Sequence, residues 1–225
     1  MITVYGYLGA PRPALVDAAA SASLVVGGRR HLDALAVPDG RRLVLGRIDP
    51  AIDAIRALPA GADAVVVASG DPLFYGVVRR LRAAGLALRV VPEVGSLQAA
   101  FAAVALPWDD ALLVSAHGND PAPALAACRT HPKVGLLTDP RTGLGEIVAA
   151  TAGLGRLYVL AERIGEEDER VRVLTEDEAA AVTPAQPHVV LVLAHHPDDP
   201  AALGAQHPLA GGPREIGRAS CRERV

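Results

Sequence analysis

The stretch Val65-Val66-Val67-Ala68-Ser69-Gly70-Asp71-Pro72-Leu73-Phe74-Tyr75-Gly76 decides the fold. A continuous apolar run that ends in a Ser-Gly-Asp-Pro turn is typical of a buried parallel strand. Residues 75–84 then have helical spacing, with apolar side chains on one face and arginines on the other. We therefore predict a turn at the carboxyl end of a central strand, which is where open α/β sheets bind ligands.

Three residues of this turn have the properties of a ligand site. Gly70 lets backbone approach a ligand closely. Asp71 can accept hydrogen bonds from a ligand or cap the following helix, and Pro72 suits a first helical turn. An ordinary capped turn between a strand and a helix explains these residues equally well, so both interpretations stay open at this point.

Units of strand, loop and helix repeat along the chain on both sides of this turn. Further strands are predicted at residues 2–7, 23–27, 42–45, 86–91, 111–115, 133–138, 156–161, 170–174 and 187–193, and helices at 13–22, 49–58, 97–104, 121–129, 144–152 and 176–182. This order predicts an α/β fold, with mostly parallel or mixed sheets flanked by helices. Asp49, Ser96 and Thr175 are the predicted caps of three of these helices.

A break in the helical pattern at Leu106-Pro107-Trp108-Asp109-Asp110 predicts two α/β domains, residues 1–108 and 109–194. We interpret Trp108, the only tryptophan, as a packing anchor at this junction rather than as a ligand-stacking side chain. Residues 195–225 are rich in Pro, Gly, Ala and Asp, which predicts a loose tail. Its last part, residues 215–225, has no periodic pattern and reads as non-native sequence.

The composition argues against several classes of protein. The chain has 225 residues, of which 51% are hydrophobic, enough for one large or two small cores. A net charge of -3 argues against a nucleic-acid surface. The chain has no apolar run that could span a bilayer and no signal peptide, so we expect a cytoplasmic protein. Cys128 and Cys221 make neither a disulfide framework nor a metal-ligand cluster.

Common catalytic and cofactor motifs are absent from the sequence. It has no Gly-x-Ser-x-Gly motif, no His-Glu-x-x-His motif and no Walker phosphate loop. The first loop, Gly6-Tyr7-Leu8-Gly9, matches the dinucleotide fingerprint poorly, which argues against NAD or FAD. The pair His195-His196, followed by Asp198-Asp199, has metal-binding chemistry, but it lies in the predicted tail.

Basic and imidazole side chains follow two of the predicted strands. Arg29, Arg30 and His31 form a cluster that could bind a substrate carrying several carboxylates, and a solvated basic loop is the alternative. His117 could orient a ligand or satisfy a loop carbonyl. These side chains alone do not decide between the two interpretations.

Several stretches together resemble one family, the tetrapyrrole methylases. They are Val25 to Leu32, Ala68 to Gly76, Ser96 to Phe101, Leu106 to Asp110, Ser115 to Gly118, Leu137 to Pro140 and Glu162 to Gly165. The Ser-Gly-Asp-Pro turn is shared across the family. Residues 28–31 and 106–110 resemble its C5-methylating branch, which acts on a corrin-ring precursor (precorrin-6Y or precorrin-7) in cobalamin biosynthesis.

The resemblance implies a two-domain fold with a ligand cleft between the domains, S-adenosylmethionine as the methyl donor and a homodimer. It also implies that the C15-methylating and decarboxylating activity belongs to a separate fold, carried either by a separate subunit or by a further domain. Carried over by position, the donor-binding residues would be Ser69, Gly70, Asp71, Phe74, Ser96, Leu97 and Leu137. The substrate-binding residues would be Gly6, Gly9, Arg29, Arg30, His31 and His117.

The chain departs from the family pattern in two loops. Leu8 stands where a glycine is expected, and Glu93 adds a charge to the second loop. Two alternatives therefore stay open. One is another family activity, such as a uroporphyrinogen or diphthine methylase, and the other is a non-catalytic protein that binds donor or tetrapyrrole.

The missing catalytic motifs agree with the chemistry of a sulfonium donor. Transfer of its activated methyl group needs alignment and exclusion of water rather than a metal or a covalent nucleophile. The sequence assigns no catalytic base, and no residue pattern separates a cobalt-containing ring from a metal-free one.

Overall fold

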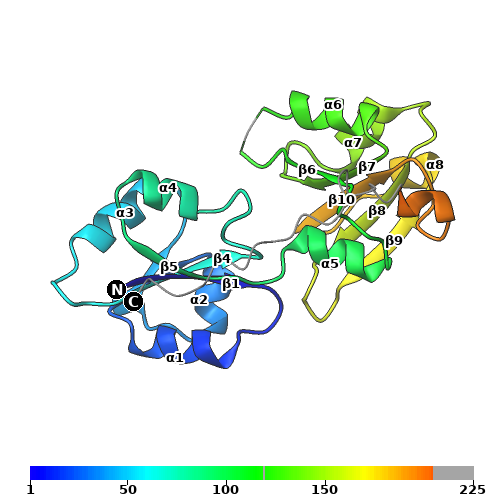
Figure 1. Ribbon diagram of the computed structural model, residues 1–225. Helices are drawn as coiled ribbons and strands as arrows, with labels where there is room; N and C mark the ends of the chain where they lie inside the picture. Colours follow the sequence, from blue (N-terminus) through cyan, green and yellow to red (C-terminus); the bar gives the residue numbers. More distant parts are fainter. Residues whose placement is uncertain (119, 205–225) are drawn as a thin grey trace, which may run out of the picture.

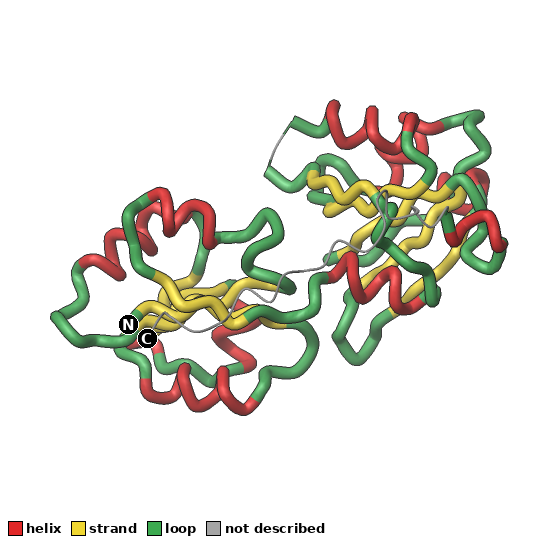
Figure 2. The backbone as a smooth tube through the Cα atoms, in the orientation of Figure 1, coloured by secondary structure: helices red, strands yellow, loops and turns green. Residues whose placement is uncertain are grey.

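The structure, a computed structural model, describes residues 1–118 and 120–204. It contains two five-stranded sheets, each flanked by helices (Figures 1 and 2). In chain order the elements are β1 (Ile2–Tyr7), α1 (Pro13–Ser21), β2 (Leu24–Gly27), α2 (Arg29–Ala34), η1 (Asp39–Arg41), β3 (Arg42–Val44), α3 (Ile48–Arg56), β4 (Ala64–Ser69), α4 (Val78–Ala83), β5 (Leu88–Val91), α5 (Ser96–Ala103), β6 (Leu112–Ser115), α6 (Ala122–Thr130), β7 (Lys133–Leu137), α7 (Leu144–Thr151), β8 (Leu157–Glu162), β9 (Arg170–Leu174), α8 (Glu176–Ala180), β10 (His188–Leu193) and η2 (Pro200–Leu203).

The first sheet is entirely parallel, in the order β3-β2-β4-β1-β5. The central strand β4 is buried on both faces, which explains its continuous apolar run. Val66 packs in the core under α3 and α4, whereas Val65 and Val67 pack in the core under α1 and α2. Figure 1 shows these two pairs of helices on opposite faces of the sheet.

The second sheet is mixed, in the order β6-β7-β10-β8-β9. Strands β6 and β7 are parallel, and the other neighbours are antiparallel. Its central strand β10 is buried at all six positions. Val190 and Val192 face the core under α6, α7 and α8, and Leu191 faces the opposite core, under α5. The α/β fold class predicted from the sequence is therefore confirmed.

Helix α5 crosses from one sheet to the other. It follows β5 of the first sheet, but its Leu97 and Phe101 are buried in the second sheet's core together with Val159. We therefore propose that the domain boundary lies in the loop at residues 92–95, ahead of the predicted break at 108. Trp108 is 40% exposed, so most of its surface is covered, and its interpretation as a packing anchor stays a prediction.

The helix after the central strand starts later than the sequence predicts. The helix after the central strand begins at Val78 rather than at Tyr75, because Tyr75 has a positive φ of 50°. Pro72 therefore lies in a turn and not in a first helical turn. The Asp71 carboxylate accepts the Leu73 N–H at 2.9 Å, so it stabilises that turn and caps no helix.

The predicted caps have different outcomes. Asp49 lies inside α3 and forms ion pairs with Arg47 and Arg80 instead of capping. Ser96 is the first residue of α5, and the Gln98 side chain accepts the preceding Gly95 N–H at 2.7 Å. The Thr175 capping box is confirmed.

Residues 195–204 are ordered against the second domain, so the prediction of a loose tail is wrong for this part. Asp199 caps η2, and Ala202 is buried in the core under α5. Residues 205–225, including the predicted non-native segment, lie outside the described residues. Within the described residues, no helix combines the length and the apolar character needed to cross a membrane.

Candidate functional site

The carboxyl ends of the neighbouring strands β1 and β4 form the centre of the candidate site. After β1 the chain turns to α1 on one face of the sheet, and after β4 it turns to α4 on the other face. Loops that diverge in this way leave a crevice at the strand ends, the usual ligand position in such sheets. The Gly70 N–H donates to the Tyr7 carbonyl at 2.7 Å and so joins the two loops at their base.

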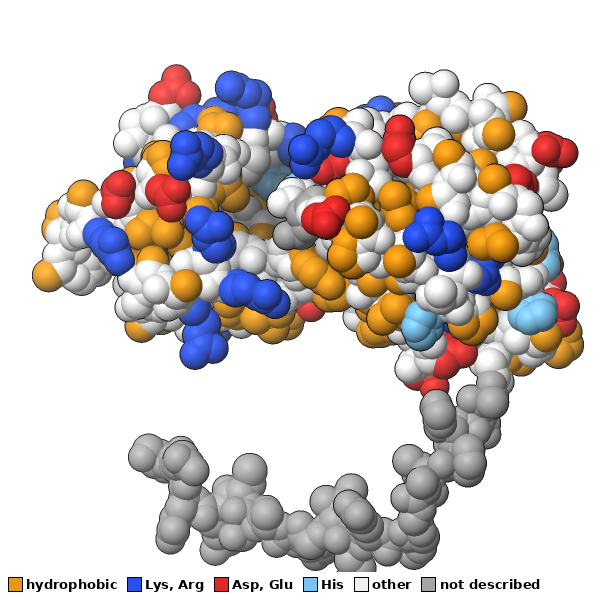
Figure 3. Space-filling view, turned by 90° about the horizontal axis from the view of Figure 1, so that it is seen from above, with side chains coloured by type: hydrophobic (Ala, Val, Ile, Leu, Met, Phe, Trp, Pro, Cys, Tyr) orange, Lys and Arg blue, Asp and Glu red, His pale blue; other side chains and the backbone are white. Residues whose placement is uncertain are grey.

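A cavity of about 300 Å³ lies at this point, between the two domains. Its walls on the first domain are residues 7–9, Arg30 and residues 69–70. Its walls on the second domain are Ser96, Ala161, Ile164, Glu166 and residues 187–189. Figure 3 shows the hollow between the two lobes, with basic and acidic side chains around it. The cleft implied by the resemblance is therefore present.

Glycines bring the backbones of three loops together beneath the cavity. A Cβ atom at Gly6 would lie 2.5 Å from the Gly70 carbonyl oxygen and 2.7 Å from the Glu93 nitrogen. Gly70 itself has a φ of +61°, and a Cβ there would lie 3.4 Å from the Ser96 nitrogen. The turn after β4 and the loop after β5 can be this close only because these two positions carry no side chain.

A second glycine contact joins the two domains. A Cβ atom at Gly9 would lie 2.7 Å from the Gly165 carbonyl oxygen, and one at Gly165 would lie 2.7 Å from the Gly9 nitrogen. Both glycines have a positive φ. Backbone therefore packs on backbone where the first loop of one domain meets the loop after β8 of the other.

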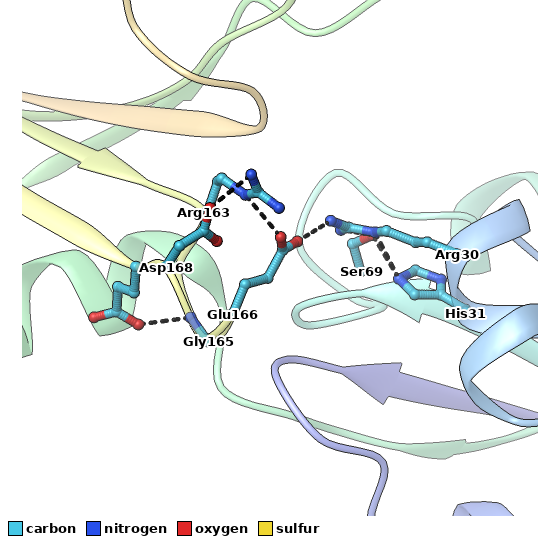
Figure 4. A network of polar contacts seen from close by, with 8 residues as sticks. Arg30, His31, Ser69, Arg163, Gly165, Glu166 and Asp168 are labelled. Atoms are coloured by element: carbon cyan, nitrogen blue, oxygen red, sulfur yellow. Dashed lines mark hydrogen bonds and ion pairs between the residues drawn. The ribbon is translucent and has the colours of Figure 1, made fainter.

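A polar network crosses the cleft beside this contact (Figure 4). The Arg30 Nη1 donates to Glu166 Oε1 at 2.7 Å, and its Nη2 donates to Ser69 Oγ at 3.2 Å. The other Glu166 carboxylate oxygen accepts from Arg163 Nε at 3.0 Å. Glu166 of the second domain thus bridges an arginine of each domain.

His31 lies beneath Arg30 and contacts this network. It is 3% exposed, and its Nε2 accepts from Arg30 Nε at 3.3 Å and lies 3.3 Å from Ser69 Oγ. Its Nδ1 has no hydrogen-bond partner among the described residues. Burial, with a further contribution from the Arg30 charge, lowers the pKa of His31 to about 4. A neutral imidazole therefore orients Arg30 at neutral pH.

The lowered pKa of His31 predicts a pH dependence of stability. The unfolded chain binds a proton on this residue below pH 6.5, whereas the folded protein does so only near pH 4. The free energy of unfolding therefore falls as the pH falls through this window, by about 2 kcal/mol between pH 7 and pH 5 from this residue alone. We expect urea denaturation of His31→Asn to lack this part of the pH dependence. The exposed His131 gives the control variant His131→Asn, which should behave like the original protein.

Burial also lowers the pKa of His188, which adds a pH dependence of the same sign. His31→Asn should therefore reduce the slope without abolishing it. Equal slopes in the two variants would contradict the assignment to His31.

The predicted site residues divide into two groups. Gly9, Arg30, Ser69, Gly70 and Ser96 line the cavity. The others lie behind or away from its walls: Gly6 is beneath it, and His31 is beneath Arg30.

Four more of these residues pack elsewhere or only stabilise a turn. Asp71 is partly buried in the turn after β4. Phe74 and Leu137 pack against the core under α5, and the Leu97 side chain is buried in that core. A ligand in the cavity could reach Leu97 only through its main chain. The proposed donor contacts of these side chains stay predictions.

Two predicted substrate residues lie apart from the cavity. Arg29 is exposed on α2 and does not line the cavity. His117 is exposed on the loop after β6, where its backbone N–H donates to Ser115 Oγ at 3.2 Å. Within the described residues, no group of three or more His, Cys, Asp or Glu side chains is arranged to hold a metal ion.

The two departures from the family pattern have clear places in the structure. Leu8 lines the cavity, as its position in the first loop suggests. Glu93 forms an ion pair with Arg12 and accepts the Val94 N–H at 2.9 Å. Its charge is therefore paired and does not face the cavity.

Sequence reasoning missed the acidic side of the site. The acidic run at residues 166–169 has the pattern of a solvated loop, but Glu166 lines the cavity and pairs with Arg30. The signal was the position of this acidic run directly after the Arg163-Ile164-Gly165 stretch that resembles the family.

Comparisons with known proteins agree with this geometry. The family model described as Tetrapyrrole (Corrin/Porphyrin) Methylases matches residues 13–180. A cobalt-precorrin-7 C(5)-methyltransferase of Salmonella typhimurium is 34% identical over 183 residues, covering 77% of this chain and 90% of the relative. A decarboxylating precorrin-6Y C(5,15)-methyltransferase of Sinorhizobium sp is 34% identical over 166 residues, covering 68% of this chain and 38% of the relative.

Among solved structures, a uroporphyrin-III C-methyltransferase of Thermus thermophilus in complex with S-adenosyl homocysteine has the same fold. It is 20% identical and superimposes with a TM-score of 0.62, covering 85% of this chain and 91% of that chain. At this identity the likeness shows the fold alone.

Proposed function

The chain belongs to the tetrapyrrole (corrin/porphyrin) methylases and is a methyltransferase, and from this premise we propose that it methylates C5 of a corrin-ring precursor in cobalamin biosynthesis. The observation that carries the proposal is the cavity between the domains, with glycine loops on one side and Arg30 at its wall. The names of the two relatives at 34% identity support the C5 position and the corrin ring.

We propose S-adenosylmethionine as the methyl donor, placed against Ser69, Gly70 and Ser96. The chain offers a suitable surface there, because Gly70 has a positive φ and carries no side chain to exclude a ligand. The structure of the Thermus relative contains the demethylated donor, which supports the same ligand class. The donor, when bound, supplies an electrophilic methyl group.

The residues of the chain then act by orientation and by exclusion of water. Arg30 would bind a carboxylate of the ring, since a guanidinium forms strong, directional hydrogen bonds with carboxylates. The second domain covers the cavity with Ala161, Ile164 and Val189, whose apolar side chains keep water from the reacting carbon. Such positioning is the main catalytic contribution when the methyl group is already activated.

Homodimer formation, a cytoplasmic location and a separate C15-methylating subunit are part of the same proposal and rest on the resemblance. Another family activity, such as uroporphyrinogen methylation, is less well supported, because the relevant structures share only the fold with this chain. A non-catalytic binding role is also less well supported. One of the two departures from the family pattern that favoured it, the Glu93 charge, is paired with Arg12.

Calorimetric titration with S-adenosylhomocysteine tests the donor site. We expect saturable binding to the original protein, and about tenfold weaker binding to Asp71→Ala, which loses the hydrogen bond that stabilises the turn after β4. Asp53→Ala is the control, because Asp53 is exposed on α3 and lies outside the cavity lining. Absence of binding at millimolar ligand would contradict the methyltransferase proposal for this cavity.

A further inference from the structure

We propose that Glu166 occupies the place of a substrate carboxylate between Arg30 and Arg163, and that the ring binds by displacing it. The inference rests on the proposed function, because it concerns how a polycarboxylate ring enters the cavity. It adds a carboxylate-binding pair of arginines, one from each domain, and an internal acidic competitor for them.

The first observation is the geometry of the Glu166 carboxylate. One oxygen lies 2.7 Å from Arg30 Nη1 and the other lies 3.0 Å from Arg163 Nε. A single carboxylate is therefore held between two guanidinium groups that come from opposite sides of the cleft (Figure 4). This is the arrangement that arginines adopt around a bound carboxylate ligand.

The second observation is that both arginines are oriented independently of Glu166. Arg30 also donates to Ser69 Oγ and to His31 Nε2. Arg163 also forms an ion pair with Asp168 at 2.7 Å. Departure of the Glu166 side chain would leave both guanidinium groups in place for another carboxylate.

The third observation is that the Glu166 contact is weak enough to exchange. The side chains of Arg30, Arg163 and Glu166 are 49%, 39% and 29% exposed, respectively. Ion pairs this accessible to water contribute little to stability. The Glu166 backbone is fixed separately, because its N–H donates to the Arg163 carbonyl at 2.9 Å. Its side chain can therefore swing away without unfolding the loop.

The position of the pair completes the argument. Arg30 and Glu166 both line the cavity, and the neighbouring Gly165 is in backbone contact with Gly9. A carboxylate that replaces Glu166 would therefore link the two domains at the same point as the residue it displaces. The contact between the two domains would therefore be kept while the ring is bound.

The test compares Glu166→Gln with Glu167→Gln. Both variants remove one negative charge from the same loop, but Glu167 is exposed and forms none of the ion pairs of this network, which makes it a matched control. The probe is cobyrinic acid, a corrin that carries free carboxylates, titrated in the presence of saturating S-adenosylhomocysteine. Its heptamethyl ester, which carries no free carboxylate, controls for binding through the ring alone.

We expect Glu166→Gln to bind cobyrinic acid roughly fivefold more tightly than the original protein, the order of effect of one exposed ion pair. Glu167→Gln should change the affinity little, and Arg163→Gln should weaken it. The affinity for S-adenosylhomocysteine should be the same in all variants. The ester should show no difference between Glu166→Gln and the original protein.

Equal or weaker binding of cobyrinic acid by Glu166→Gln would overturn the proposal, as would an equal gain in Glu167→Gln. Failure of every variant to bind cobyrinic acid while S-adenosylhomocysteine still binds would also overturn it. Loss of S-adenosylhomocysteine binding in the original protein would instead contradict the proposed function. The two failures are therefore distinguishable.

Discussion

Gly6→Ala is expected to abolish measurable binding of S-adenosylhomocysteine and to lower the free energy of unfolding by about 3 kcal/mol or more. The added Cβ would lie 2.5 Å from the Gly70 carbonyl oxygen and 2.7 Å from the Glu93 nitrogen, distances that real Cβ atoms do not adopt. Both contacts are with backbone, so no side-chain rotation relieves them. The turn after β4 and the loop after β5 must therefore separate, and these loops carry the proposed donor contacts.

Gly46→Ala is the control for this prediction. Gly46 is exposed, and a Cβ atom there would meet nothing within 4 Å. Urea denaturation and calorimetry of the two variants measure stability and donor binding separately. Wild-type affinity in Gly6→Ala would show that the three loops can move apart without affecting the donor site.

The features of the fold that could be predicted from sequence are the local ones. The apolar run of residues 65–67 identified the central strand, because a parallel strand buried on both faces needs no polar alternation. The Ser-Gly-Asp-Pro turn placed Ser69 and Gly70 at its carboxyl end, where the cavity lies. The Thr175 capping box was also readable, since all its contacts lie within four residues.

The features that could not be predicted depend on contacts between distant segments. Helix α5 is made mostly of alanine and other apolar residues that could pack against either sheet, and only the position of the second sheet decides that Phe101 packs there. Pairing of Arg30 with Glu166 joins residues 136 positions apart. A run of four acidic residues such as 166–169 is usually solvated. The role of Glu166 is therefore visible only when the two domains are placed together.

Asp110 is another residue whose role depends on a distant segment. Its ion-pair partner explains the stretch at residues 106–110, which the sequence pattern indicates as a domain junction. Lys133 is 4% exposed at the start of β7, and its Nζ donates to Asp110 Oδ1 at 2.5 Å and to the Pro107 carbonyl at 3.0 Å. The Leu-Pro-Trp-Asp-Asp stretch thus neutralises a buried ammonium group of the second sheet. This stretch, which resembles the C5-methylating branch, therefore packs in the second domain, and none of its residues lines the cavity.

Asp110→Ala should accordingly lower the free energy of unfolding by about 3 kcal/mol, because it leaves the buried Lys133 charge without its carboxylate. Asp109→Ala is the matched control, since Asp109 is the exposed neighbour in the same stretch, and it should change stability by less than about 0.5 kcal/mol. Urea denaturation measures both values.

The double variant Asp110→Ala, Lys133→Met separates the lost pair from a general disturbance of the loop. Removing both charges takes away the unpaired group, so most of the lost stability should return. Equal stabilities for Asp110→Ala and Asp109→Ala would show that Lys133 is adequately solvated by the Pro107 carbonyl and water. Recovery in the double variant would instead show that the stability lost in Asp110→Ala comes from the unpaired Lys133 charge and not from a disturbance of the loop.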